Sequence, residues 1–257
     1  MSKDTYGRFV WFDLMSTEPE AAIKFYSDVV GWTTQKWEGG DPNYTMFVAD
    51  GTPIGGVNQL SQEAADMGAP THWLSYVTIA DVEGVVEKIK ASGGTVLKEA
   101  MTMPGVGTFA IIQDPQGGVI APFTQEKASD EPDDVIPNGW FSWHELATTD
   151  RQGAIDFYYP IFGWVDSDQM DMGPGGIYQM YKAPGMSFAL GGIHNKAPET
   201  PATSWLYYIK VSDLDQALTR VAESGGKVLN GPMDVPGGDR VAQCMDPQGG
   251  AFALHGK

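Results

Sequence analysis

Cysteine, basic side chains and long apolar runs are all scarce in this sequence. Its 257 residues include one cysteine, Cys244, which excludes a disulfide within the chain and a cluster of thiolate metal ligands. Cys244 lies in the apolar segment 241–245, so we expect a small buried side chain rather than a nucleophile. The shortage of cysteine fits the reducing cytoplasm, which is the location we expect.

The low content of basic residues limits the choice of partner. The chain has 16 Lys and Arg residues against 33 Asp and Glu residues, a formal net charge of −17, which repels nucleic acid and anionic membrane surfaces at long range. No run of about 18 apolar residues occurs, and the N-terminal segment lacks an apolar export signal. We therefore expect a small-molecule ligand, no nucleic-acid or membrane partner, and no export.

An internal repeat dominates what the chain does contain. When the sequence is aligned on itself with an offset of 132, the difference between Gly139 and Gly7, similar residues coincide along its length. The matching pairs are Phe9 and Phe141, Trp11 and Trp143, Leu14 and Leu146, Phe25-Tyr26 and Phe157-Tyr158, Gly31-Trp32 and Gly163-Trp164, Trp73-Leu74 and Trp205-Leu206, and Asp114-Pro115-Gln116-Gly117-Gly118 and Asp246-Pro247-Gln248-Gly249-Gly250. Such a register indicates duplication. Polar, proline-bearing residues 126–138 predict a linker between domains 1–125 and 139–257.

The first half of each copy predicts a strand, a helix and three strands. Residues 9–14 alternate as a strand, and Thr17 and Glu20 have the spacing of a capping box before a helical pattern that Gly31 ends. The β-prone runs that follow are 32–37, 44–49 and 54–60. In the second copy Pro160 is expected to end or kink the equivalent helix early, after an opening at Thr149 and Gln152.

The second half of each copy repeats this order. A strand at 73–79 precedes a helix capped by Asp81, and strands near 95–97, 108–113 and 119–124 follow, the last two joined by a turn at Asp114. The glycine pairs Gly55-Gly56 and Gly191-Gly192 are interpreted as turns or bulges. The fold class is therefore α+β, with four βαβββ units whose curved mixed sheets enclose a hollow in each copy.

Together these motifs resemble the vicinal oxygen chelate superfamily. The resemblance depends on a helix that ends in Phe-Tyr, then Gly-Trp, and an Asp-Pro-x-Gly turn before a final strand, and it covers residues 7–125 and 139–257. The superfamily includes glyoxalase I, extradiol dioxygenases, and the bleomycin- and fosfomycin-resistance proteins. It implies two tandem glyoxalase-like domains, whereas the function has to be argued from the site.

The resemblance also implies where a metal would bind. Enzymes of the superfamily hold a divalent ion with His, Gln or Glu side chains from the first and last strands of paired units. Those positions fall here on Trp11, Trp143, Leu74, Leu206, Ala121 and Ala253. None is a ligand for such an ion, so we expect no metal and no other cofactor. A relocated metal site built from Glu145 and His255 stays open as an alternative.

The residues expected to face the hollows are aromatic, with a few polar groups among them. Strand alternation places Trp11, Asp13 and Tyr76 there in the first copy, and Trp143, Glu145, Tyr208 and His255 in the second, whereas His144 points the other way. We predict Asp13 and Glu145 as catalytic acids or bases, because they recur at one position in both copies. The other five hollow-facing side chains, Trp11, Tyr76, Trp143, Tyr208 and His255, are predicted to bind the ligand.

Three functions stay open at this point. The aromatic hollows favour a protein that binds an aromatic or hydrophobic small molecule, and either sequesters it or acts on it without a metal. The second is a lyase, isomerase or dioxygenase with relocated metal ligands. The third is a structural or interaction protein whose tryptophans fill the hollows. Because paired units lie within one chain, we expect a monomer or a weak homodimer.

Overall fold

The computed structural model describes residues 6–39, 44–126 and 135–257. In the first copy the strands are β1 (Phe9–Ser16), β2 (Thr33–Lys36), β3 (Thr45–Ala49), β4 (Thr52–Gln59), β5 (His72–Thr78), β6 (Thr95–Met103), β7 (Gly107–Gln113) and β8 (Val119–Gln125). In the second they are β9 (Phe141–Thr148), β10 (Val165–Asp171), β11 (Ile177–Lys182), β12 (Gly191–Asn195), β13 (Ser204–Lys210), β14 (Lys227–Asp234), β15 (Arg240–Met245) and β16 (Ala251–Gly256). The helices are α1 (Pro19–Val30), α2 (Gln62–Asp66), α3 (Val82–Ala91), α4 (Arg151–Phe162) and α5 (Leu214–Glu223), with a 3-10 turn at Gly173–Gly175.

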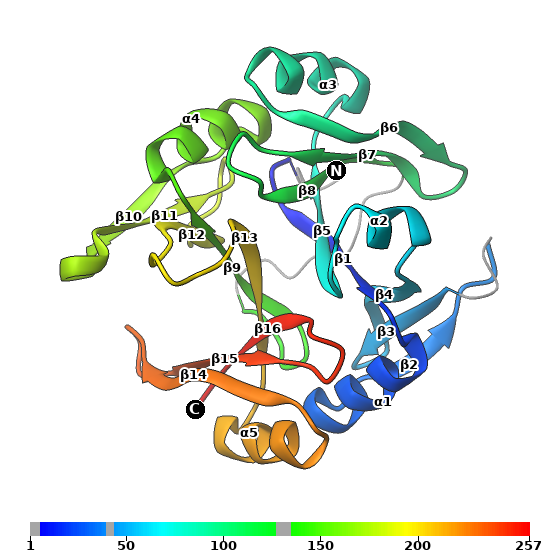
Figure 1. Ribbon diagram of the computed structural model, residues 1–257, viewed down its shortest axis with the longest axis vertical. Helices are drawn as coiled ribbons and strands as arrows, with labels where there is room; N and C mark the ends of the chain where they lie inside the picture. Colours follow the sequence, from blue (N-terminus) through cyan, green and yellow to red (C-terminus); the bar gives the residue numbers. More distant parts are fainter. Residues whose placement is uncertain (1–5, 40–43, 127–134) are drawn as a thin grey trace. The chain divides into compact units, whose positions relative to one another are not determined.

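Each copy forms one mixed eight-stranded sheet within these described ranges. The strand orders are β2-β3-β4-β1-β5-β8-β7-β6 and β10-β11-β12-β9-β13-β16-β15-β14 (Figure 1). Both orders confirm the α+β class and the four βαβββ units, with α2 as an additional short helix. None of the helices in the described part of the chain is long and apolar enough to cross a membrane.

The described residues group into two compact units, and each unit takes half of its residues from either copy. Of the described residues, the first unit draws on 6–11, 75–126 and 143–205, and the second on 12–39, 44–74, 135–142 and 206–257. In the first unit α3 contacts α4, and in the second α1 contacts α5. The boundaries predicted for the sequence domains stay a prediction, and residues 127–134 of the predicted linker lie outside the described ranges.

A chain of hydrogen bonds joins the two copies inside the second unit. Trp73 Nε1 donates to the Tyr26 hydroxyl at 3.0 Å, and Tyr26 donates to Asp246 Oδ2 at 3.1 Å. Asp246 Oδ1 accepts from the backbone N–H groups of Gln248 and Gly250 at 2.9 and 2.7 Å. Burial raises the pKa of Asp246, and these hydrogen bonds oppose the shift. The Phe-Tyr motif of one copy is therefore bonded to the Asp-Pro-x-Gly turn of the other.

The first unit contains the reciprocal chain. Trp205 Nε1 donates to the Tyr158 hydroxyl at 3.3 Å, and Tyr158 donates to Asp114 Oδ2 at 2.8 Å. Asp114 Oδ1 accepts from the backbone N–H groups of Gln116 and Gly118, both at 2.8 Å. The two motifs on which the family resemblance depends are thus partners of each other, and each pair is made between copies.

Three predictions about where helices begin or end are wrong, for local reasons. No side-chain hydrogen bond caps α1, whose N-cap is Glu18 with Pro19 at the first turn, so Thr17 does not form a capping box. In the second copy Asp150, rather than Thr149, caps α4 through the N–H of Gly153. Pro160 does not shorten α4, which continues to Phe162. The last turn is fixed by packing, because Phe162 is fully buried.

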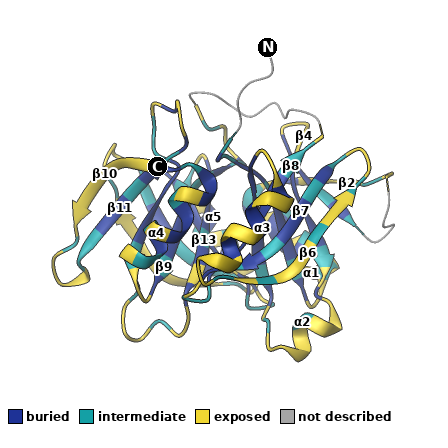
Figure 2. Cartoon of the chain, turned by 90° about the horizontal axis from the view of Figure 1, so that it is seen from above, coloured by how far each residue is buried: buried dark blue, intermediate teal, exposed yellow. Residues whose placement is uncertain are grey.

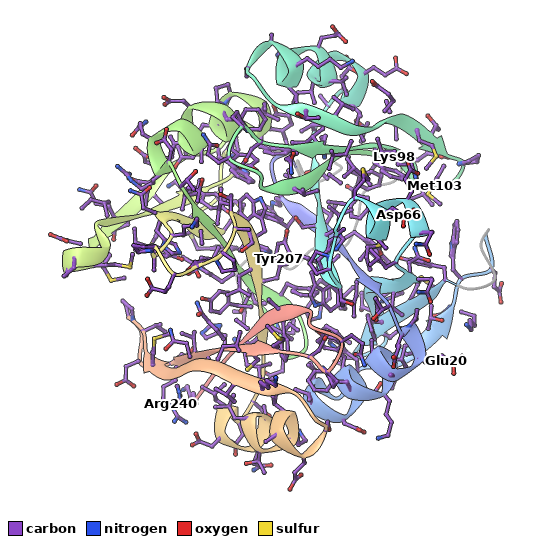
Figure 3. All side chains as sticks on the ribbon, in the orientation of Figure 1. Glu20, Asp66, Lys98, Met103, Tyr207 and Arg240 are labelled. Carbon is purple, nitrogen blue, oxygen red and sulfur yellow. The ribbon has the colours of Figure 1, made fainter. Side chains whose placement is uncertain are left out.

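Stacked rings join β1 to β9 in each of the two units. In the first unit Phe9 stacks on His144 with ring centroids 3.8 Å apart, and in the second Phe12 stacks on Phe141 at the same distance. Tyr207, labelled in Figure 3, packs edge-on against Phe12. His144 therefore faces the core. It is buried, its Nδ1 lies 2.7 Å from Leu190 O, and burial lowers its pKa to about 3.

Exposure is concentrated at the edges of the sheets (Figure 2). All residues of β2, β10 and β14 are exposed, and most of those of β6 are. These four are the terminal strands in the two strand orders. The acidic side chains of β10 discourage pairing with another chain, because a charged edge strand is a poor template for an added strand.

Removing the hydroxyl of Tyr26 or Tyr158 tests the bonds between the copies. Tyr26→Phe and Tyr158→Phe each remove a donor from a buried carboxylate, so each should lower the free energy of unfolding by roughly 1–3 kcal/mol. Tyr159→Phe is the matched control, because its hydroxyl bonds Asp166 at the surface, and it should cost less than about 0.5 kcal/mol. Urea denaturation measures all three, and core variants as stable as the control would contradict the role given to these bonds.

His144 should make the protein sensitive to acid. The unfolded chain takes up a proton below the ordinary pKa of 6.5, whereas folded His144 stays neutral down to about 3, so the folded state loses stability as pH falls through 6.5. His144→Phe installs the side chain of the equivalent Phe12. Between about pH 6 and pH 4 the free energy of unfolding should fall more steeply in the wild type than in the variant. The difference in slope should be about 1.4 kcal/mol per pH unit. Parallel pH dependences in denaturation experiments would show that His144 does not cause the sensitivity.

Candidate functional site

The predicted acid of the second copy, Glu145, ends a hydrogen-bonded chain in the first compact unit. Trp143 Nε1 donates to the Tyr178 hydroxyl at 2.7 Å, and Tyr178 donates to Glu145 Oε2 at 2.9 Å. Trp143 and Glu145 lie two positions apart on β9, so they share a face of the strand. The carboxylate is buried and the indole is half-buried, so the chain leads from an accessible aromatic surface to a buried acid.

His194 on β12 completes this group of side chains. Its Nε2 lies 3.7 Å from Glu145 Oε1, its Nδ1 lies 3.0 Å from Asn195 O, and its ring stacks on Tyr178. Burial lowers the pKa of His194, but its interaction with the Glu145 carboxylate outweighs burial, and the net shift is upward. We refer to Trp143, Glu145, Tyr178 and His194 as the Glu145 cluster. Its acid and its imidazole form a pair that can hold a proton and pass it on.

Glycines opposite the acids make room for the tyrosine rings. Gly192 pairs with Glu145 between β12 and β9, and Gly56 pairs with Asp13 between β4 and β1. A Cβ atom at Gly192 would collide with the ring of Tyr178, and one at Gly56 would collide with the ring of Tyr44. The register between β3 and β4 shifts by one residue directly before Gly55, so a bulge lies beside the first glycine pair, as predicted. Gly191 and Gly192 pair with β11 without a register shift, so the prediction of a turn or bulge is wrong for them. Both pairs belong to strands, where a side chain would displace the ring that reaches the acid.

The first copy has a simpler arrangement, which lies in the second compact unit. Tyr44 donates to Asp13 Oδ1 at 2.6 Å, and Asp13 is buried. Asn58 pairs with Met15 as His194 pairs with Ala147, so an amide stands where the second copy has its imidazole. The first copy therefore has an acid and a tyrosine, and an amide at the position where the second copy has an imidazole.

The sequence did not indicate Tyr44 and Tyr178 as partners of the acids, because the repeat offset changes within the copy. Gly56 and Gly192 pair with acids that are 132 residues apart, yet the glycines themselves are 136 apart, the difference between 192 and 56. The ungapped alignment therefore did not match Tyr44 with Tyr178. The recurring Gly-Gly pairs were the available signal, because a glycine inside a strand often marks a close approach.

The other predicted ligand-binding residues lie elsewhere on the strands. In the first unit Tyr76 packs on Phe109 and Phe123, with ring centroids 5.5 and 6.0 Å apart, and Trp11 is half-buried. In the second unit Tyr208 is buried. The structure thus brings Trp143 together with Glu145, and the binding roles given to these side chains stay predictions.

His255 has a hydrogen-bond partner at each ring nitrogen, both in the second unit. Its Nδ1 lies 2.9 Å from Ser142 Oγ, and its Nε2 lies 3.1 Å from Asp239 Oδ2. Strict alternation on β9 separates Ser142 from the face of Trp143, so the sequence did not indicate this contact. Glu145 belongs to the other unit, and each of the two residues proposed for a relocated metal site is bonded within its own unit.

The side chains at the family's metal positions do not fit a divalent ion. Ala121 pairs with Tyr76 and Ala253 pairs with Tyr208. Each of these alanines therefore lies on the last strand of its copy, β8 or β16. Indole, isobutyl and methyl groups offer none of the oxygen, imidazole or thiolate donors that such an ion requires. In residues 6–39, 44–126 and 135–257, no three His, Cys, Asp or Glu side chains are grouped so that they could hold a metal.

Comparison with known proteins agrees with this fold. A family model described as the Glyoxalase/Bleomycin resistance protein/Dioxygenase superfamily matches residues 8–121 and 140–254. The chain is 30% identical over 246 residues to the Mycobacterium bovis protein named "Putative glyoxylase CFP32", which covers 95% of this chain and 92% of that protein. It is also 33% identical over 125 residues to the anthracycline biosynthesis protein DauV of Streptomyces sp. strain C5, covering 44% of this chain and 45% of that protein.

A solved structure extends the comparison to the fold. The chain is similar to the Mn(II)-bound glyoxalase of Novosphingobium aromaticivorans, with a TM-score of 0.65 and 16% identity, over 100% of this chain and 83% of that one. At this identity the likeness concerns the fold alone. The family model covers most of both copies, and the mycobacterial relative matches nearly the whole chain. This chain therefore belongs to the glyoxalase/bleomycin resistance protein/dioxygenase superfamily.

Proposed function

We propose that the chain binds a flat aromatic or otherwise apolar small molecule and transfers a proton to or from it with Glu145, without a metal. The observation that carries this proposal is the Glu145 cluster, in which a buried carboxylate is bonded to Tyr178 and faces His194. A carboxylate that is buried at a cost to the fold, and paired with an imidazole, is a common arrangement for proton transfer.

Each member of the Glu145 cluster has a separate role in the proposed proton transfer. Glu145 takes a proton from the ligand or returns one to it. His194 accepts or supplies the proton between turnovers, since its pKa is raised by the carboxylate against the effect of burial. Tyr178 holds one carboxylate oxygen at 2.9 Å, which fixes the direction of the other. Its own hydroxyl is in turn fixed by the indole N–H of Trp143.

Aromatic surface supports a flat or apolar ligand. Trp143 is half-buried and is held in one orientation by its bond to Tyr178, so its ring can receive a ligand without losing much conformational freedom. The relative DauV is named for the biosynthesis of anthracyclines, which are flat aromatic compounds. This likeness favours a ligand of the same shape. We propose the second copy as the acting one, because His194 has no imidazole counterpart in the first.

The same proposal covers the cofactor, the assembly and the location. Tryptophan, leucine and alanine at the family's metal positions support a reaction that depends on acid and base groups of the chain. Each compact unit already combines both copies, which supports a monomer or a weak homodimer. The acidic composition and the single cysteine support a cytoplasmic protein without a nucleic-acid or membrane partner.

Ligand binding tests the first part of the proposal. In a thermal-shift screen of fused-ring phenols and quinones, at least one compound should stabilise the protein increasingly with concentration, and EDTA should not change the shift. Trp143→Leu should then raise the dissociation constant of that compound by tenfold or more, about 1.4 kcal/mol. Trp11→Leu is the matched control from the first copy and should leave it within about threefold. An EDTA-sensitive shift, or equal losses in both variants, would contradict the proposal.

The proton-holding pair makes a separate prediction that needs no ligand. In Glu145→Gln the charge that raises the pKa of His194 is lost while burial remains, so the pKa of His194 should move from above 6.5 to below it. Titration of the imidazole resonances by NMR measures this shift for each of the four histidines. Asp13→Asn, the equivalent change in the first copy, should leave His194 unchanged. An unaltered His194 titration in Glu145→Gln would remove the basis for a proton-transferring pair.

A further inference from the structure

The second compact unit contains a serine, a histidine and an aspartate in series, which the proposed function does not use. Ser142 Oγ lies 2.9 Å from Nδ1 of His255, and Nε2 of the same ring lies 3.1 Å from Asp239 Oδ2. The side chains of His255 and Asp239 are 24% and 27% exposed, so a small molecule can reach the ring. Nucleophile, base and orienting acid occur in this order in acyl-transfer sites on several unrelated folds.

The first copy forms the same strands without any of these three residues. With the offset of 132, Val10, Gly107 and Phe123 occupy the positions of the serine, the aspartate and the histidine. A Cβ atom on Gly107 would collide with Thr124 O and lie 2.6 Å from the ring of Phe123, and the φ of Gly107 is +148°, so both the backbone and the phenylalanine favour glycine there. The fold therefore does not require polar side chains at these three positions. All three positions differ together, which points to a chemical role in the second copy.

The protonation of His255 directs the hydroxyl of Ser142. Burial lowers the pKa of His255, the charge of Asp239 opposes this effect, and the charge of Lys210 adds to it. The ring is therefore neutral near pH 7. The ring donates its Nε2–H to Asp239, so its Nδ1 carries no proton and can accept a hydrogen bond from Ser142 at 2.9 Å. This distance is shorter than the 3.3 Å between Ser142 Oγ and Tyr208 O. The serine proton thus points at a base.

The neighbouring cations are held by other partners. Arg240, labelled in Figure 3, donates two hydrogen bonds to Asp215 at 3.0 and 2.9 Å. Lys210, which pairs with His255 between β13 and β16, donates to Ile136 O at 2.9 Å. Asp239 is therefore the charged group bonded to the imidazole. Burial is the main cause that lowers the pKa of His255, and the charge of Lys210 adds to it.

We propose that Ser142, His255 and Asp239 form a nucleophilic site that takes acyl groups from activated esters or thioesters. Ser142 Oγ bonds to the acyl carbon while its proton moves to Nδ1 of His255. The bond from the acyl carbon to the alkoxide or thiolate breaks, and the leaving group takes that proton. Water then cleaves the acyl-serine, which yields a carboxylic acid and the free hydroxyl, with no net oxidation or reduction.

Acetylation by 4-nitrophenyl acetate tests this site on the full chain. Peptide mass spectrometry should find the acetyl group on Ser142, and its rate should rise with pH as His255 loses its proton. Ser142→Ala should abolish acetylation at this position. His255→Phe and Asp239→Gly, which install the residues of the first copy, should slow the acetylation of Ser142 by about 100-fold or more. Circular dichroism checks that both variants remain folded.

Matched controls separate a built site from ordinary surface reactivity. Ser212→Ala removes an exposed serine of the same unit and should leave the acetylation of Ser142 at the wild-type rate. Val10→Ser places a hydroxyl at the equivalent position of the first copy, which lacks the histidine, and should gain no acetyl group. Acetylation of Ser142 at an unchanged rate in folded His255→Phe, or none in the wild type, would overturn the proposal. Ligand stabilisation at the Glu145 cluster is measured separately, so each proposal can fail alone.

Discussion

The hydrogen bond from a helix tyrosine of one copy to a turn aspartate of the other is the constraint on which the arrangement depends. Asp114 and Asp246 are buried carboxylates, and each must receive donors from nearby or burial would be too costly. The backbone of its own turn supplies two, and the tyrosine of the opposite copy supplies the third. Since each turn leads directly into β8 or β16, these bonds also fix the strands that carry Phe123 and His255.

Local structure was predictable because it depends on local chemistry. The left-handed end of α1 at Gly31, the cap of α3 at Asp81 and the turn after Asp114 all follow from residue types at short spacing. The pairing of half-copies into compact units was not predictable, because two similar copies carry the same apolar faces. The apolar pattern around Tyr26 does not indicate whether this tyrosine bonds to the Asp-Pro-x-Gly turn of its own copy or to that of the other copy.

The site was predictable only where strand alternation sufficed. Asp13 and Glu145 recur at one position on β1 and β9, and both are buried. Their tyrosine partners lie 31 and 33 residues away along the chain, Tyr44 just before β3 and Tyr178 on β11, beyond the reach of a two-residue period. The repeat offset also changes there, from 132 at the acids to 136 at the glycines that pair with them. Ser142 was missed for a related reason, because ideal alternation places it on the opposite face from Trp143.

Sharing of each core between the copies has a consequence for how such a chain can change. A molecule with a single copy could bury the ring of Tyr26 or Tyr158 only by pairing with a second molecule, and every substitution would then occur twice. Joining the copies in one chain removes that symmetry. One strand can carry His144 or His255 where its counterpart carries Phe12 or Phe123, while the counterpart keeps its aromatic packing and holds the shared scaffold together.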